Sequence, residues 1–316
     1  MSTHSPLELL VPRNGTAVLQ HLQRLVGREG HQRWCGGKVI PTKVPAFLEK
    51  MAGRYPILRN TRERSYDRHR GRAVVHLVVS PQFGIAAHTP SPTLKWWLLS
   101  GHGAGGLADP ASPDAHVTRD AMSGNGHIQV HDYVLMYATK RQSHEVTDRR
   151  SGDTRRIWTD TSSWTWKIQQ SVLAEVRSAI ESCCKALELG EEPNTEHAGW
   201  GLRGLLAAQR ARPLFSGVRN QVIDLHKHAA EIWARHRGAW ISAHPQVSRR
   251  LGPHAGGLPS IADVIARDLP TMRQLKIYET PPRSIRDLLA FQQEALAPAQ
   301  RSNATETHKS IEDPTR

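Results

Sequence analysis

The chain has 316 residues and a formal net charge of +13 at pH 7, with 42 Lys or Arg residues against 29 Asp or Glu residues. This excess favours a phosphate-rich partner, because each Lys or Arg placed on a phosphate releases condensed counterions. Three cysteines are too few for a disulfide framework, and no run of about 18 apolar residues offers a membrane span. We therefore expect a soluble, cytoplasmic protein without a membrane partner.

Two short helices are predicted in the N-terminal part of the chain. Apolar residues recur at three- and four-residue steps in residues 16–28, and residues 46–52 show the same pattern over a shorter length. Residues 33–45, which lie between them, contain glycine and proline and are predicted to form a connector. We interpret residues 1–53 as an N-terminal helical layer.

The central part is predicted to be a sheet domain of residues 54–190. Strand patterns occur at residues 73–79, 94–100, 127–139 and 157–168. The charged residues 140–156 are predicted to form the tip of a hairpin between the last two strands. A helix at residues 169–189 is expected to cover one side of the sheet. The predicted fold class is α+β, with a small antiparallel sheet of about four strands and covering helices.

The remainder is predicted to be mainly helical and basic. Helical patterns occur at residues 202–210, 215–240, 261–268 and 284–296. Residues 200–253 hold nine Lys or Arg against two Asp or Glu. We interpret residues 191–296 as a basic helical region joined to the sheet domain, and residues 297–316 as a disordered tail because they are polar and contain few apolar residues.

No motif in the chain identifies a cofactor or a metal ion. Residues 101–106 and 199–204 both match GxGxxG, but neither connects a strand directly to a helix, as a dinucleotide-binding loop does. The N–H groups of such a loop can still approach a phosphate. His127 and His131 would lie roughly 13 Å apart on one strand, too far apart to share an ion. We expect neither a cofactor nor a metal site.

Basic residues concentrate in three segments. Seven arginines occur within residues 54–72, of which Glu63 and Asp67 can neutralise only two. The other two segments are residues 140–156 and residues 200–253. The candidate phosphate contacts are Arg54, Arg59, Arg62, Arg64, Arg68, Arg70, Arg72, Lys140, Arg141, Arg149, Arg150, Arg155, Arg156, Arg212, Arg219 and Lys227.

These patterns favour a nucleic-acid-binding subunit of a bacterial ribonucleoprotein or DNA-processing complex, with further protein subunits as partners. The sequence does not distinguish RNA from DNA as the partner. One alternative is an enzyme, a metal-independent endonuclease whose candidate acids and bases are His102, His127, His131 and Tyr133. Another alternative is a protein-interaction scaffold whose basic faces meet acidic protein surfaces.

Overall fold

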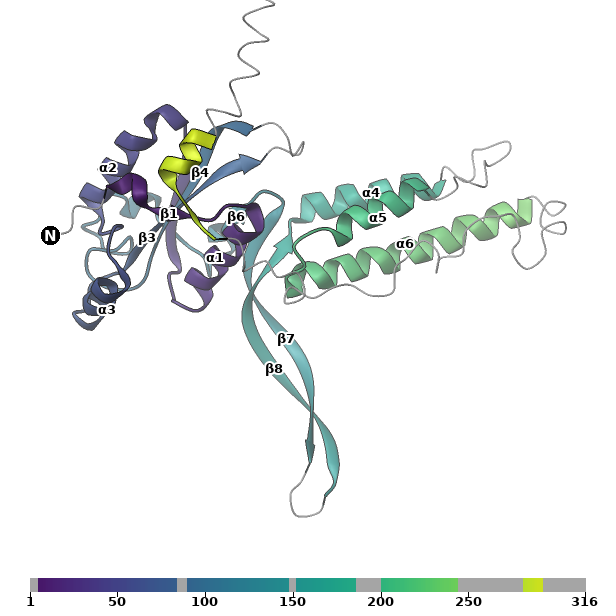
Figure 1. The fold of residues 1–316 in the computed structure, drawn as a ribbon. Coiled ribbons are helices and arrows are strands. Elements are labelled where there is room, and N and C mark those ends of the chain that lie inside the picture. Colours follow the sequence, from purple (N-terminus) through teal and green to yellow (C-terminus); the bar gives the residue numbers. More distant parts are fainter. Residues whose placement is uncertain (1–4, 84–89, 148–151, 186–199, 244–280, 292–316) are drawn as a thin grey trace, which may run out of the picture. The chain divides into compact units, whose positions relative to one another are not determined.

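The computed structural model describes residues 5–83, 90–147, 152–185, 200–243 and 281–291 (Figure 1). The chain divides into two units, one of Met1–His127 with Ile277–Arg316 and the other of Ile128–Lys276. Antiparallel sheets combine with helices, and the C-terminal region is helical, so the predicted α+β class is confirmed. The unit boundaries do not coincide with the predicted domain boundaries after residues 53, 190 and 296, because packing contacts cross positions 53 and 190.

The main sheet of the first unit contains two strands that the sequence does not predict. Its order is β3 (Val75–Phe83), β4 (Pro90–Ser100), β2 (Arg33–Val39) and β5 (Arg119–Asp120), and the unpredicted strands are β2 and the short β5. The interpretation of residues 33–45 as a connector is wrong for β2, which pairs with β4 along its whole length. A Cβ on Gly36 would lie 2.7 Å from the Trp96 carbonyl oxygen. The glycines of β2 thus make room for Trp96, and tertiary packing overrides their low strand propensity.

Three helices accompany this sheet, and two of the three begin at an asparagine cap. They are α1 (Gly15–Gly27), α2 (Val44–Arg54) and α3 (Thr61–His69). The Asn14 side chain accepts from the Ala17 N–H at 2.8 Å, and Asn60 forms a capping box with Glu63. The buried face of α2 belongs to the same hydrophobic cluster as the buried residues of β3. The predicted N-terminal layer is therefore part of the sheet unit.

The first unit also includes a segment from the far end of the sequence. Strand β1 (Leu10–Val11) pairs with β9 (Arg283–Ser284), and residues 285–291 continue as a helix. Ile285 and Leu288 are fully buried in the cluster that holds α2 and β3. Chain segments separated by more than 200 residues thus share one core.

The sheet of the second unit is a long hairpin with a short third strand. Strands β6 (Gln129–Val130), β7 (Tyr133–Thr147) and β8 (Thr154–Ile168) are antiparallel neighbours. The predicted hairpin is confirmed, and its strands pair from Tyr133 opposite Ile168 to Thr147 opposite Thr154. The prediction of residues 140–156 as its tip is wrong for residues 140–147 and 154–156, which belong to the paired strands. The predicted single strand at residues 127–139 is wrong, because a turn at His131 and Asp132 separates β6 from β7.

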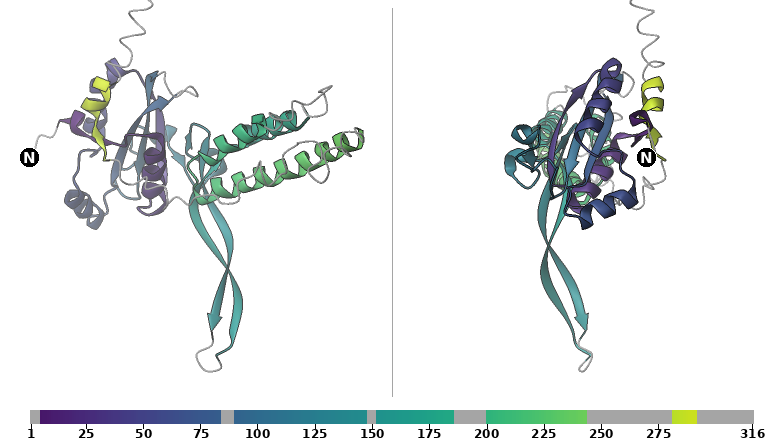
Figure 2. Two further views of the ribbon diagram at one scale, coloured as in Figure 1. Left: turned by 45° about the vertical axis from the view of Figure 1, so that its right-hand side comes forward. Right: turned by 90° about the vertical axis from the view of Figure 1, so that its left-hand side faces the viewer.

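Three helices complete the second unit: α4 (Gln170–Lys185), α5 (Trp200–Arg210) and α6 (Ser216–Ala243) (Figure 2). Helix α6 packs against both β8 and α4. In its first turn, a Cβ on Gly217 would collide with the Trp166 carbonyl oxygen of β8. Gln221 of α6 bonds both the N–H and the carbonyl of Ile168, at 2.7 and 3.1 Å. Helix α6, assigned to a separate region by the sequence pattern, therefore covers this sheet directly.

Two predicted features lie outside the described residues, namely the helix at residues 261–268 and the tail at residues 297–316. The last predicted helix, at residues 284–296, corresponds to the helical residues 285–291 as far as the structure describes it. None of the described helices combines the length and the apolar character that crossing a membrane requires.

Candidate nucleic-acid interface

The arginine run at residues 54–72 extends from the end of α2 through α3 to the start of β3. Six of its arginines are exposed, and Arg64 is half-buried. Four of them pair with carboxylates: Arg54 with Asp114 at 3.2 Å, Arg59 with Glu63 at 3.4 Å and Asp67 at 3.6 Å, Arg68 with Glu29 at 3.7 Å, and Arg72 with Asp67 at 3.9 Å. The run is less cationic than its sequence suggests, because two acids from other elements join it.

Two arginines of the run have a different environment. Within the described residues, Arg62 and Arg70 form no ion pair, and the Arg70 guanidinium lies 4.5 Å from the centre of the Tyr66 ring. Both side chains project from α3 or its C-terminal end into solvent. Among the exposed arginines of the run, these two are the ones whose charge is uncompensated.

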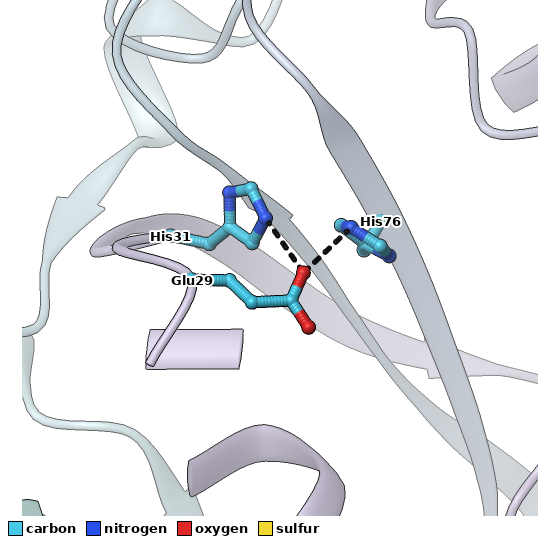
Figure 3. A group of neighbouring side chains, drawn as sticks. All are labelled: Glu29, His31 and His76. Carbon is cyan, nitrogen blue, oxygen red and sulfur yellow. Dashed lines mark ion pairs between the residues drawn. The ribbon is translucent and has the colours of Figure 1, made fainter. Parts of the chain in front are cut away.

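A buried polar cluster formed by Glu29, His31 and His76 adjoins this run (Figure 3). Glu29 and His31 follow α1, whereas His76 lies on β3. The Glu29 Oε2 atom lies 3.5 Å from His31 Nε2 and 3.7 Å from His76 Nε2. His31 is 1% exposed and His76 is 7% exposed. Arg24 and Arg68 contact the same Glu29 carboxylate, at 3.5 and 3.7 Å, so the cluster connects the core to the arginine run.

Burial keeps the histidines of this neighbourhood neutral at pH 7. Burial, reinforced by the charge of Arg64, lowers the pKa of His76 to about 2. Burial also lowers the pKa of His31, although Glu29 opposes this effect. The nearby His21 has its pKa lowered to about 4, again mainly by burial. Imidazoles in this state retain a nitrogen lone pair that can accept a proton or bind a metal ion.

The glycine loop at residues 101–106 packs against the end of the arginine run. Gly103 has φ of 132°, and a Cβ there would lie 2.6 Å from the Ala73 backbone nitrogen. The N–H groups of Gly101, Ala104, Gly105 and Leu107 donate to acceptors within the chain. These groups are therefore occupied, and the loop is explained by close backbone packing rather than by phosphate binding.

The second basic segment forms the distal ribbon, defined as residues 139–147 of β7 and 154–163 of β8. Of its residues whose exposure is described, all are exposed except Ser143 and Ile157, which are half-buried. Figure 1 shows this part of the hairpin extending beyond the helices of its own unit. Within its own unit, no described helix or strand covers either of its faces.

An aromatic ring between two guanidinium groups occupies one face of the distal ribbon. Trp158 is 54% exposed, and the Cζ atoms of Arg141 and Arg156 lie 5.4 and 6.0 Å from its ring centre. Strand register places Arg141 opposite Asp160 and Arg156 opposite Glu145, yet neither arginine forms an ion pair within the described residues. Both guanidinium groups therefore contact the Trp158 ring and do not pair with the carboxylates of Asp160 and Glu145.

Trp158 has no equivalent in the described part of the chain. The other tryptophans whose burial is described are buried or half-buried, in agreement with the core role expected of a tryptophan. The sequence does not distinguish Trp158 from them, because it lies in the same alternating strand as Trp164 and Trp166. Trp158 differs from Trp164 and Trp166 in that no described element of its unit packs over it.

The remaining candidates of the hairpin are only partly described. Arg155 is exposed on the ribbon face opposite to Trp158. Lys140 lies in β7, but its side chain is outside the description, and Arg149 and Arg150 lie outside the described residues. They stay candidates on the sequence alone.

Two of the three candidates of the helical region, Arg212 and Lys227, have structural partners. Arg212 donates to Asp132 at 2.9 Å, to the Tyr133 hydroxyl at 3.2 Å and to Gln209 at 2.7 Å. These hydrogen bonds connect the C-terminal end of α5 to the turn between β6 and β7. Arg219 is half-buried, and the exposed Lys227 lies 4.0 Å from Asp224. The structure favours a packing role for Arg212 over a phosphate contact.

His127, His131 and Tyr133 were predicted to share one strand face and do not, and the fourth endonuclease candidate, His102, lies in the glycine loop. His102 and His127 belong to the first unit, whereas His131 and Tyr133 belong to the second. His131 occupies the hairpin turn with φ of 50°, and Tyr133 is buried with its hydroxyl bonded to Arg212. The shared face was predicted from an unbroken strand, and the turn at His131 removes it.

Sequence reasoning missed the cluster of Glu29, His31 and His76. One signal was present, because His76 is the single polar residue of an apolar strand. Comparison of the chain with protein-family models, with curated proteins and with solved structures found no match. The functional argument therefore rests on the geometry described above.

Proposed function

We propose that this protein binds nucleic acid, as a subunit of a ribonucleoprotein or DNA-processing complex. The distal ribbon is the principal contact in this proposal, and the uncompensated arginines of α3 contribute further phosphate contacts. The observation that carries the proposal is Trp158, an exposed ring between two unpaired guanidinium groups on an uncovered ribbon.

The chemistry of this ribbon face suits a nucleic acid better than an acidic protein. An exposed indole stacks on a base of any sequence, and such stacking contributes about 1–3 kcal/mol per base. The flanking arginines would contact phosphates on either side of the stacked base, and each contact releases counterions. An acidic protein surface would use the arginines but would offer no flat partner for the ring.

The shape of the ribbon also supports the proposal. A two-stranded antiparallel ribbon fits the major groove of B-DNA, and its exposed strand edges can follow a single strand equally well. An uncovered two-stranded hairpin is only marginally stable in water. Its retention as a long arm is therefore best explained by a partner that orders it.

Titrations of labelled single-stranded DNA, duplex DNA and RNA with the full chain, followed by fluorescence anisotropy, test this proposal. We expect binding at low salt, with a logarithm of the association constant that falls linearly with the logarithm of the salt concentration. Absence of binding to all three polymers at low salt would overturn the proposal.

A competition experiment separates nucleic-acid binding from the scaffold alternative. If an acidic polypeptide displaces the oligonucleotide at equal charge concentration, the basic surface recognises negative charge alone and the scaffold is favoured. If the oligonucleotide resists displacement, the ring contributes recognition beyond charge, as we propose.

A further inference from the structure

We infer that Glu29, His31 and His76 form a binding site for one divalent transition-metal ion, for which Zn²⁺ is the best match. Two imidazole nitrogens and one carboxylate oxygen are ligands that Zn²⁺ commonly takes in proteins. The inference departs from the expectation that the chain contains no metal site, which was based on sequence spacing. It does not depend on the proposed nucleic-acid binding.

The spacing of the three ligand atoms is close to that of a metal centre. A tetrahedral zinc ion with ligands at about 2.0–2.1 Å has neighbouring ligand atoms about 3.3 Å apart. Glu29 Oε2 lies 3.5 Å from His31 Nε2 and 3.7 Å from His76 Nε2, and all three residues offer atoms within 4.8 Å of one another (Figure 3). These two edges exceed the tetrahedral value by only a few tenths of an ångström, and the third edge, between the two imidazole nitrogens, would have to close from at most 4.8 Å when an ion binds.

The two imidazoles lack the partners that buried polar atoms normally have. His31 Nε2 and His76 Nε2 are both buried, and within the described structure neither makes a hydrogen bond of normal length, because the Glu29 carboxylate oxygen lies 3.5 and 3.7 Å away. Leaving a buried polar atom unpaired costs about 1–3 kcal/mol, so two such atoms directed at one carboxylate need an explanation. A metal ion between them and Glu29 would satisfy both at once.

The surrounding backbone is shaped for this arrangement. A Cβ on Gly101 would lie 3.0 Å from His31 Nδ1, so glycine at this position leaves the space that the imidazole occupies. Residues 29 and 31 are fixed by the chain leaving α1, since the His31 N–H donates to the Leu25 carbonyl at 3.0 Å. The ligands are therefore held by the fold before any ion arrives.

The cluster reaches solvent on the Glu29 side, where an ion could enter. The Glu29 side chain is 25% exposed, and its present partners Arg24 and Arg68 are 55% and 52% exposed. These flexible side chains can leave the carboxylate for solvent at little cost, because exposed ion pairs contribute about 0–1 kcal/mol. A water molecule or an anion attracted by the two arginines would occupy the fourth position.

Metal binding by the untagged full chain, stripped of metal with a chelator, tests the inference. Co²⁺ serves as a spectroscopic probe of tetrahedral coordination, and Zn²⁺ binding is measured by calorimetry and elemental analysis. We expect one tight equivalent per chain, whose affinity falls at least about tenfold in Glu29→Gln and in His76→Ala. His102→Ala, which removes an exposed histidine of the same unit, should bind as the unaltered chain does.

Two outcomes overturn the inference. One is the absence of a tight equivalent, and the other is equal binding by the unaltered chain and both ligand variants; each would make the cluster an ion-pair network only. If His76→Ala fails to fold, the near-isosteric Glu29→Gln variant provides the decision, with circular dichroism as the check on folding.

Discussion

The arginine run around α3 and the distal ribbon both concentrate basic residues but differ in their surroundings. Around α3, Glu29 and Asp114 arrive from other elements and pair with the run, and the adjoining carboxylate contacts buried histidines. On the ribbon, Arg141 and Arg156 lie beside the exposed Trp158 ring and form no ion pair with the carboxylates opposite them in the strand register. The density of charge along a sequence therefore does not measure the charge that a surface offers to a partner.

The difference follows from what covers each region. Helix α3 and the rest of the run lie in a unit with a shared hydrophobic cluster, so acids from distant positions can reach the arginines of the run. No described element of its own unit covers the distal ribbon, so among the described residues of that unit its side chains contact neighbours on the two strands. We therefore assign packing roles to much of the α3 region and a binding role to the ribbon, and the predictions below test this division.

The largest effect is expected at Gly103, in the loop that packs against the arginine run. Gly103→Ala places a Cβ 2.6 Å from the Ala73 nitrogen and the Arg72 carbonyl carbon, at φ of 132°. We expect the free energy of unfolding to fall by about 2–4 kcal/mol, from backbone strain and overpacking together. Denaturant unfolding measures this change.

Gly105→Ala is the matched control. Gly105 also has a positive φ, of 74°, but nothing lies within 4 Å of its Cβ position. Its substitution should cost only the left-handed backbone term of about 1–2 kcal/mol. If both variants lose the same free energy of unfolding, the close contact of Gly103 with the backbone of Arg72 and Ala73 does not contribute to stability.

A smaller effect is expected at Tyr55, which holds the acid that pairs with Arg54. The Tyr55 hydroxyl donates to Asp114 Oδ2 at 2.8 Å and lies 2.8 Å from the Ser112 hydroxyl. Tyr55→Phe should lower the free energy of unfolding by about 1–3 kcal/mol, because a hydrogen bond to a carboxylate is lost. The exposed Tyr66→Phe should leave this free energy unchanged.

The Tyr55 effect should also depend on pH. Burial, together with Asp114, raises the pKa of Tyr55 to about 12, from an ordinary value of 10.0. Below pH 10 the hydroxyl is protonated in both states, so its full contribution is present. Between pH 10 and pH 12 the unfolded chain ionises first, and the contribution is lost. The stability difference between the unaltered chain and Tyr55→Phe should shrink across this window, and a constant difference would contradict the assignment.

Much of the fold follows from local sequence patterns. The hairpin and the helices corresponding to α1, α2, α4, α5 and α6 could be predicted because apolar spacing determines which face of each element is buried. Strand β2 could not, because Gly36 and Gly37 resemble a loop until Trp96 is known to pack against them. The turn at His131 could not be predicted either. His131 has a positive φ, which is uncommon for a residue other than glycine, so the sequence gives no turn signal at this position.

The candidate site was less predictable than the fold. Arginine-rich segments are visible in the sequence, but the partners of Arg54 and Arg68 lie 60 and 39 positions away, at Asp114 and Glu29. The exposure of Trp158 likewise depends on which elements cover the hairpin. Both features arise from tertiary packing, which local patterns do not record.

The most direct test of the central claim compares two triple variants that remove the same charge. The ribbon variant is Arg141→Gln, Arg156→Gln and Trp158→Ala; the α3 variant is Arg59→Gln, Arg72→Gln and Tyr66→Phe. Affinity for a single-stranded oligonucleotide is measured by anisotropy at several salt concentrations. We predict that the ribbon variant loses about tenfold or more in affinity, with a salt slope shallower by about 1.4–1.8, and that the α3 variant stays within about twofold. Equal losses, or a larger loss in the α3 variant, would contradict the account.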